Sequence, residues 1–175
     1  MAKDYLNVIE RALMMGISDK LNAVVTGDIY VYGEFPETED LKFPAVVVQM
    51  VASGFDEQFM GQSVSFGSDS SSGKGEVYGV SYLVHILLER DTVIKIDTSG
   101  NGTPDTDYKQ RRLMNWLMLN IANAVSDIDW AVYEEEELEI LRRQLNAWRD
   151  VGFLTSFQWY GATAEFTLHF KNYRV

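Results

Sequence analysis

The longest regular pattern in the sequence is a two-residue alternation over residues 76–89. Large apolar side chains occupy every second position, and the positions between them are smaller, polar or leucine. Because successive side chains of a β-strand point to opposite faces, this pattern predicts one long strand with a buried face. A strand of this length needs partners, so we expect the chain to build around a sheet. The apolar positions are Tyr78, Val80, Tyr82, Val84, Ile86 and Leu88.

Shorter segments predict the partners of this strand. Residues 29–32 are β-branched and aromatic, and the valine-rich run 45–51 is typical of a strand covered on both faces near the centre of a sheet. Residues 157–170 alternate again around Gly161 and Ala162, which predicts a C-terminal hairpin with its turn at these two residues.

Three segments carry apolar residues at the three- and four-residue spacing of a helix face: 4–25, 106–125 and 134–150. In the third, the face comprises Leu138, Leu141, Leu145 and Trp148. The order of elements predicts an α+β fold, in which an N-terminal helix and two further helices pack on a mostly antiparallel sheet. The length of 175 residues fits one domain, 1–175, with long polar loops near 54–75 and 91–106.

Composition excludes several classes of function. The formal net charge of -11 opposes binding to phosphate backbones and anionic membranes, so sequence-specific recognition of nucleic acid is not expected. The chain has no cysteine, which excludes disulfides and thiolate chemistry. We find neither a signal-peptide pattern at the N-terminus nor an apolar run of about 18 residues, and therefore expect a soluble protein.

Candidate catalytic residues are few. His85 and His169 both lie in strand patterns without a neighbouring nucleophile or acid at a suggestive spacing. We therefore predict no catalytic residues, no cofactor and no enzymatic activity. An enzyme that uses buried carboxylates stays an alternative, and it requires a pocket with at least two acidic groups of perturbed pKa.

Each of two acidic segments allows a structural and a functional interpretation. The run Glu134, Glu135, Glu136 and Glu137 is typical of a solvated helix start, or of a negative surface that faces a channel or a basic partner. Asp97-x-Ser99-x-Asn101-Gly102 matches the first half of a calcium-binding loop, but the twelfth position is Tyr108 where a bidentate glutamate is needed. A plain turn is the main interpretation, and a calcium-dependent protein-binding module is the alternative.

The arrangement resembles the tail terminator and tail-completion (neck) proteins of tailed bacteriophages. The resemblance covers most of the chain and is one of pattern, without a catalytic signature. It is carried by the opening helix that ends near Val24, Phe43-Pro44-Ala45-Val46-Val47-Val48, the strand 78–90 with its following insertion, the helix 111–125, and the closing segments Phe157-Gln158-Trp159-Tyr160-Gly161 and Glu165-Phe166-Thr167-Leu168-His169-Phe170.

The resemblance implies a structural virion protein at the neck, or top, of the tail, assembled in the host cytoplasm. Its subunits are expected to form a hexameric ring that caps the tail tube, stops tube polymerisation and joins the tube to neck and head proteins. Phage DNA is expected to pass through the ring without sequence-specific binding, and an acidic lumen suits this passage because like charges repel. Another head-tail connector or a head-completion subunit is the alternative within the same class.

Overall fold

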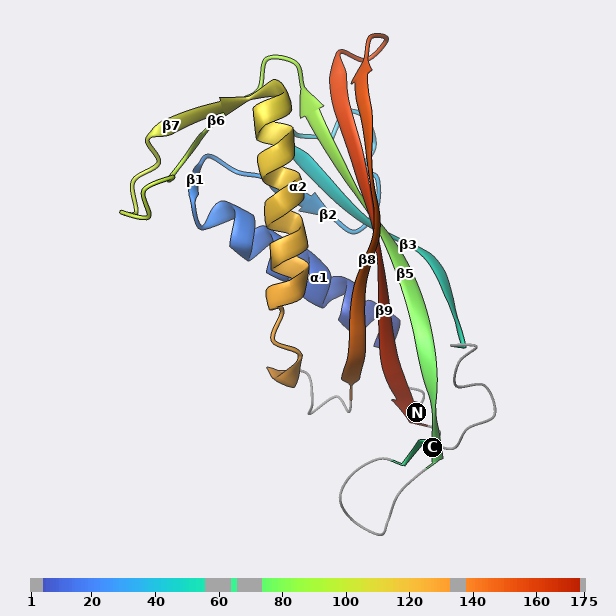
Figure 1. Cartoon of the computed structure of the whole chain (residues 1–175). Helices are drawn as coiled ribbons and strands as arrows, with labels where there is room; N and C mark the ends of the chain where they lie inside the picture. The colour runs from blue at the N-terminus through green and yellow to red at the C-terminus, as the bar shows by residue number, and fades with distance from the viewer. Residues whose placement is uncertain (1–4, 56–63, 66–73, 133–137, 174–175) are drawn as a thin grey trace.

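The computed structural model describes residues 5–55, 64–65, 74–132 and 138–173, and two helices and two sheets make up this part of the chain (Figure 1). The main sheet is six-stranded, with the order β2-β3-β5-β9-β8 and with β4 beside β5. The helices are α1 (Tyr5–Asn22) and α2 (Gln110–Asp127). The strands are β1 (Val25–Thr26), β2 (Tyr30–Tyr32), β3 (Ala45–Phe55), β4 (Val64–Ser65), β5 (Lys74–Glu89), β6 (Val93–Ile96), β7 (Thr106–Lys109), β8 (Glu139–Leu154) and β9 (Trp159–Tyr173).

The strand expected from the two-residue alternation is β5, at the centre of the main sheet. It pairs antiparallel with β3 on one side and with β9 on the other, from Gly75 to Glu89. Its alternate residues are buried, as the pattern predicts. β3 is not the central strand, because it lies second from one border of the sheet. Among the described residues, it has an outer neighbour along 45–47 only, where it pairs with β2.

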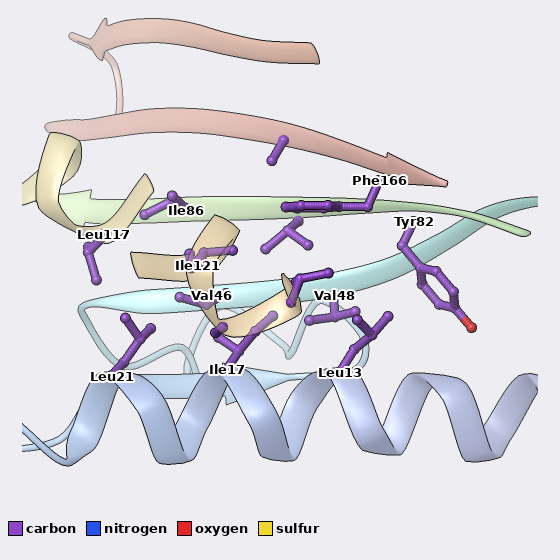
Figure 2. Close-up of a cluster of buried hydrophobic side chains, with 14 of the residues drawn as sticks. Leu13, Ile17, Leu21, Val46, Val48, Tyr82, Ile86, Leu117, Ile121 and Phe166 are labelled. Carbon is purple, nitrogen blue, oxygen red and sulfur yellow. The ribbon is translucent and has the colours of Figure 1, made fainter. Parts of the chain in front are cut away.

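Both helices cover one face of the main sheet, and the hydrophobic core lies between them and the sheet. Figure 2 shows α1 directing Leu13, Ile17 and Leu21 toward β3 and β5, while Leu117 and Ile121 of α2 point into the same layer. All five side chains are fully buried, which explains the helical spacing found in the sequence. The opposite face of the sheet, here called the open face, carries no helix in the described part of the chain.

The cations at the start of α2 oppose the helix dipole and are offset by contacts outside the helix. Arg112 lies over the ring of Tyr108, 4.1 Å from its centroid, and Arg111 is 3.4 Å from the carboxylate of Asp150 on β8. These contacts connect the beginning of α2 to β7 and to β8.

The segment 91–106, expected as a long loop, contains a strand. β6 pairs antiparallel with β7 and with the short β1, so the three form a small second sheet (Figure 1). The polar turn 97–105 is the tip of this hairpin. Of the other expected loop, 54–75, residues 56–63 and 66–73 lie outside the described residues.

The third helix predicted for 134–150 is wrong, because this part of the chain forms the long strand β8, paired antiparallel with β9. Three bulges interrupt the pairing, and each adds a residue that breaks the alternation of faces. The β8 positions that face the core side are therefore spaced by three, two and three residues, which imitates a helical stripe. These positions are Ile140, Arg143, Leu145 and Trp148, opposite the buried Phe170, Leu168, Phe166 and Ala164.

The C-terminal hairpin exists, but its turn is not at Gly161 and Ala162. The turn spans 155–158, where Gln158 has a positive φ of 59°, and β9 continues through Gly161. Gly161 and Ala162 are both buried within the sheet. No helix in the described part of the chain is long and apolar enough to cross a membrane.

Candidate functional site

The acidic run Glu134, Glu135, Glu136 and Glu137 lies outside the described residues. Its expected role as a channel-facing or partner-facing surface therefore stays a prediction. The surfaces that the structure does describe are the open face of the main sheet, the turn at Asp97 and the tip of the β8–β9 hairpin.

The two histidines lie on the open face at different levels of the sheet, and the structure does not bring them together. His85 pairs with Thr163, and its Nδ1 is 3.2 Å from the Thr163 hydroxyl; the ring of Phe35 lies 5.0 Å away. His169 pairs with Gly79 at the other end. Burial lowers the pKa of His85, which favours the neutral ring. The second ring nitrogen of His85, Nε2, is buried and has no hydrogen-bond partner among the described residues, so no acid orients this ring there.

Part of the open face is polar and carries a hydrogen-bonded ladder across three strands, while Ala45 and Val47 of β3 lie buried on the same face. The hydroxyls of Ser81 and Thr167 are 3.0 Å apart, and Asn146 of β8 donates to Thr167 at 2.6 Å and to Glu165 at 3.2 Å. Such cross-strand contacts fix the relative positions of β5, β9 and β8. This part of the face thus presents polar groups that are already hydrogen-bonded to one another.

Asp97 organises the tip of the β6–β7 hairpin by accepting hydrogen bonds from its own turn. The backbone N–H groups of Gly100 and Gly102 donate to its carboxylate at 2.7 and 2.6 Å, and those of Ser99 and Asn101 donate at 3.1 and 3.3 Å. Desolvation raises the pKa of Asp97, but these donors outweigh it and hold the pKa below its usual value. Both carboxylate oxygens are thereby engaged within the turn.

The calcium interpretation of this turn finds no support in the described part of the chain, where no group of three or more acidic or histidine side chains is placed to hold a metal ion. Thr98 donates to Asp105, so this acid is also engaged within the hairpin. The geometry is that of a turn closed by its own aspartate.

The β8–β9 hairpin ends in a cluster that we call the aromatic tip, comprising Phe43, Leu154, Phe157 and Trp159. The rings of Phe157 and Trp159 stack with centroids 5.4 Å apart, and the ring of Phe43 lies tilted against Trp159 with centroids 4.9 Å apart. Phe157 is nevertheless 62% exposed, and Leu154 is exposed beside it. Aromatic groups held rigidly at a protruding turn are typical of contact sites between proteins.

Sequence reasoning missed the aromatic tip because it placed Phe157 and Trp159 inside a strand. The missed signal was the pair of apolar residues Leu154 and Phe157 on either side of Thr155 and Ser156. Turn residues normally face water, so large apolar side chains at a turn indicate a surface that another molecule covers.

Comparison with known proteins gives a match at the level of structure. No protein-family model and no curated protein matches the chain. A solved structure determined by cryo-EM matches it with a TM-score of 0.50 and 10% identity, over 94% of this chain and 56% of that chain. That neighbour is a sheath/tube terminator. It belongs to an extracellular contractile injection system, PVC, in its extended state.

The chain thus spans about half the length of this neighbour, and at such low identity the likeness concerns the fold alone. The resemblance found in the sequence had implied a fold like that of terminator proteins. The structural match agrees with the resemblance at the coarse level of the fold.

Proposed function

We propose that this protein is a structural subunit that ends the tube or sheath of a phage tail or of a related injection assembly. The observation that carries the proposal is the likeness in fold to a sheath/tube terminator over 94% of the chain. The function is thus one of binding other subunits, and we assign no enzymatic role.

The described surfaces support a role in assembly. The aromatic tip exposes apolar area at the end of a paired hairpin, and part of the open face presents polar groups that are hydrogen-bonded to one another. Sites built from rigid apolar protrusions suit docking onto another protein, because little conformational entropy is lost on binding.

In its finer form the proposal includes a hexameric ring at the neck of a virion, formed in the host cytoplasm. The ring caps the tube, contacts tube and neck proteins, and lets DNA pass. The net charge of -11 supports this passage, since a negative wall repels phosphate, and the run Glu134 to Glu137 is the candidate lining. A head-tail connector or head-completion subunit is the alternative position in the same assembly.

Immunogold electron microscopy tests the position of the protein in such particles. Antibodies raised against the purified chain are applied to tail-like particles released by cells that encode it, and the same antibodies adsorbed with the chain serve as the control. We expect gold at one end of each tail. Gold along the whole tail indicates a tube or sheath subunit instead, and tails without gold contradict the proposal.

A further inference from the structure

The main sheet has two open edges, at opposite borders. On one border, β2 covers β3 only along residues 45–47, and residues 48–55 of β3 have no strand partner on that side in the described part of the chain. On the other border, β9 is the strand that pairs with β8 within the described residues. Figure 1 shows β3 and β8 at the two borders of the sheet. Backbone N–H and C=O groups along such edges are available for pairing with another strand.

The two open edges lie at the same level of the sheet. The open part of β3, 48–55, is opposite β5 residues 78–84, and these are opposite β9 residues 164–170. The latter pair with β8 residues 140–148. A neighbouring copy placed beside the first, without displacement along the strands, therefore brings β3 residues 48–55 to β8 residues 140–148.

Strand direction also fits. β3, β5, β9 and β8 are each antiparallel to the next, so β8 runs opposite to β3. A rotation about an axis parallel to the strands keeps these directions, so that β8 of one copy meets β3 of the next in antiparallel orientation. Antiparallel is the more stable form of pairing, and it is the form found between β3, β5, β9 and β8, whereas β2 pairs with β3 in parallel.

Both edges expose an apolar side chain, and no like charges face each other across the contact between them. Val51 on β3 is 47% exposed and Leu141 on β8 is 42% exposed, and both are bulge residues that project from the regular ladder. Residues 48–55 contain no charged side chain, so the arginines of β8 meet no like charge there. In a head-to-tail arrangement, each copy has both its β3 edge and its β8 edge covered by neighbours. A twofold contact pairs an edge with its own copy and so covers either the β3 edges or the β8 edges.

We infer that β8 of one copy pairs antiparallel with β3 of the next copy, so that the main sheets of successive copies continue into one another. This inference rests on the proposed function, which requires several copies side by side. Bulges limit the regular part of β8 to 142–145 within the shared level, so this run forms the centre of the contact.

Engineered cysteines test the contact directly, because the chain contains none of its own. Gln49 and Ala147 lie at the same level and on the same face, through Leu83 and Glu165. The double variant Gln49→Cys/Ala147→Cys is oxidised and resolved on a non-reducing gel. We expect a ladder of covalent oligomers that ends at a closed ring, while either single variant stops at dimers formed slowly.

Charge placed on the contact provides a second measurement. We expect Val51→Lys on β3, or Leu141→Lys on β8, to abolish the ladder when added to the double-cysteine chain, because either lysine places a charge in the contact. Leu119→Lys, at an exposed leucine of α2, is the matched control and should leave the ladder intact. Thermal unfolding of each variant confirms that it is folded.

Three results overturn the inference: a double-cysteine chain that stays monomeric after oxidation, an Ala147→Cys chain that dimerises as fast as the double variant forms its ladder, and a ladder unaffected by both lysines. The second result indicates twofold pairing of β8 with itself. The proposed function does not fail with the inference, because gold at one end of the tails is measured independently of how the copies touch.

Discussion

At the scale of single residues, His85 shows how a buried polar group couples stability to pH. Its Nδ1 faces the Thr163 hydroxyl, and its Nε2 is buried without a hydrogen-bond partner among the described residues. In the protonated ring both nitrogens carry a proton, and the N–H at Nε2 then has no acceptor among the described residues. Burial lowers the pKa of His85 below 6.5, the value of an ordinary histidine.

The sign of the effect follows from linkage. Below pH 6.5 the unfolded chain binds a proton at His85 that the folded chain does not, so stability falls as pH drops through this value toward the folded pKa. We expect His85→Leu to lose less stability than the wild type between about pH 7.5 and about pH 5.5. Urea unfolding at both pH values measures the difference. Equal losses in the two proteins contradict this role of His85.

At the scale of elements, patterns predicted the structure wherever one period applied along a whole segment. β5 has no bulge against β9, and its alternation was read correctly. α1 and α2 each bury one continuous stripe, but α2 begins at Gln110 rather than at 106, because residues 106–109 form β7. The prediction for 134–150 was wrong because the bulges of β8 change the spacing of its core-side residues from two to alternating steps of three and two. The same error hid the aromatic tip. Because a helix was predicted for 134–150, no strand was available to pair with β9, and the predicted turn was placed at Gly161 instead of at 155–158.

Arg143 connects β8 to α2 and explains why an arginine occupies a core-side position of the strand. Its guanidinium donates to the carbonyls of Val125, Ser126 and Ile128 at the C-terminal end of α2. These carbonyls lack partners within the helix, and the positive charge is favourable at that end of the helix dipole. Together with the contact between Arg111 and Asp150, it attaches β8 to both ends of α2.

Replacing Arg143 with methionine keeps an apolar stem but removes the donors. We expect Arg143→Met to lower the free energy of unfolding by about 1 kcal/mol, which is less than a buried charged donor contributes because Arg143 is exposed to water. Arg142→Met, one residue away, is the matched control and is expected to change stability by less than about 0.5 kcal/mol. Denaturant titration of both variants measures this. Losses of equal size show that Arg143 does not hold the end of α2.

At the scale of the whole molecule, the surfaces available for contact lie apart from the layer that forms the core. Helices on one face of the main sheet bury the core, which leaves the open face and the aromatic tip outside it. Changes at Phe157 are therefore separable from changes in stability, because this exposed ring contributes little to the core, while Trp159 contacts both Phe43 and Phe157. A function carried by the tip is thus testable in a folded protein.

Phe157→Glu places a charge at the most exposed ring of the tip and should oppose docking on an apolar partner surface. We expect the variant to keep its melting temperature and to bind tail-like particles from cells lacking the protein at least about tenfold more weakly, which corresponds to about 1.4 kcal/mol. Met15→Glu, at an exposed position of α1, is the matched control and should bind like the wild type. Cosedimentation with the particles measures the bound fraction. Because both variants add one negative charge, a similar loss in both reflects charge alone, whereas a loss confined to Phe157→Glu identifies the aromatic tip as the contact with the rest of the particle.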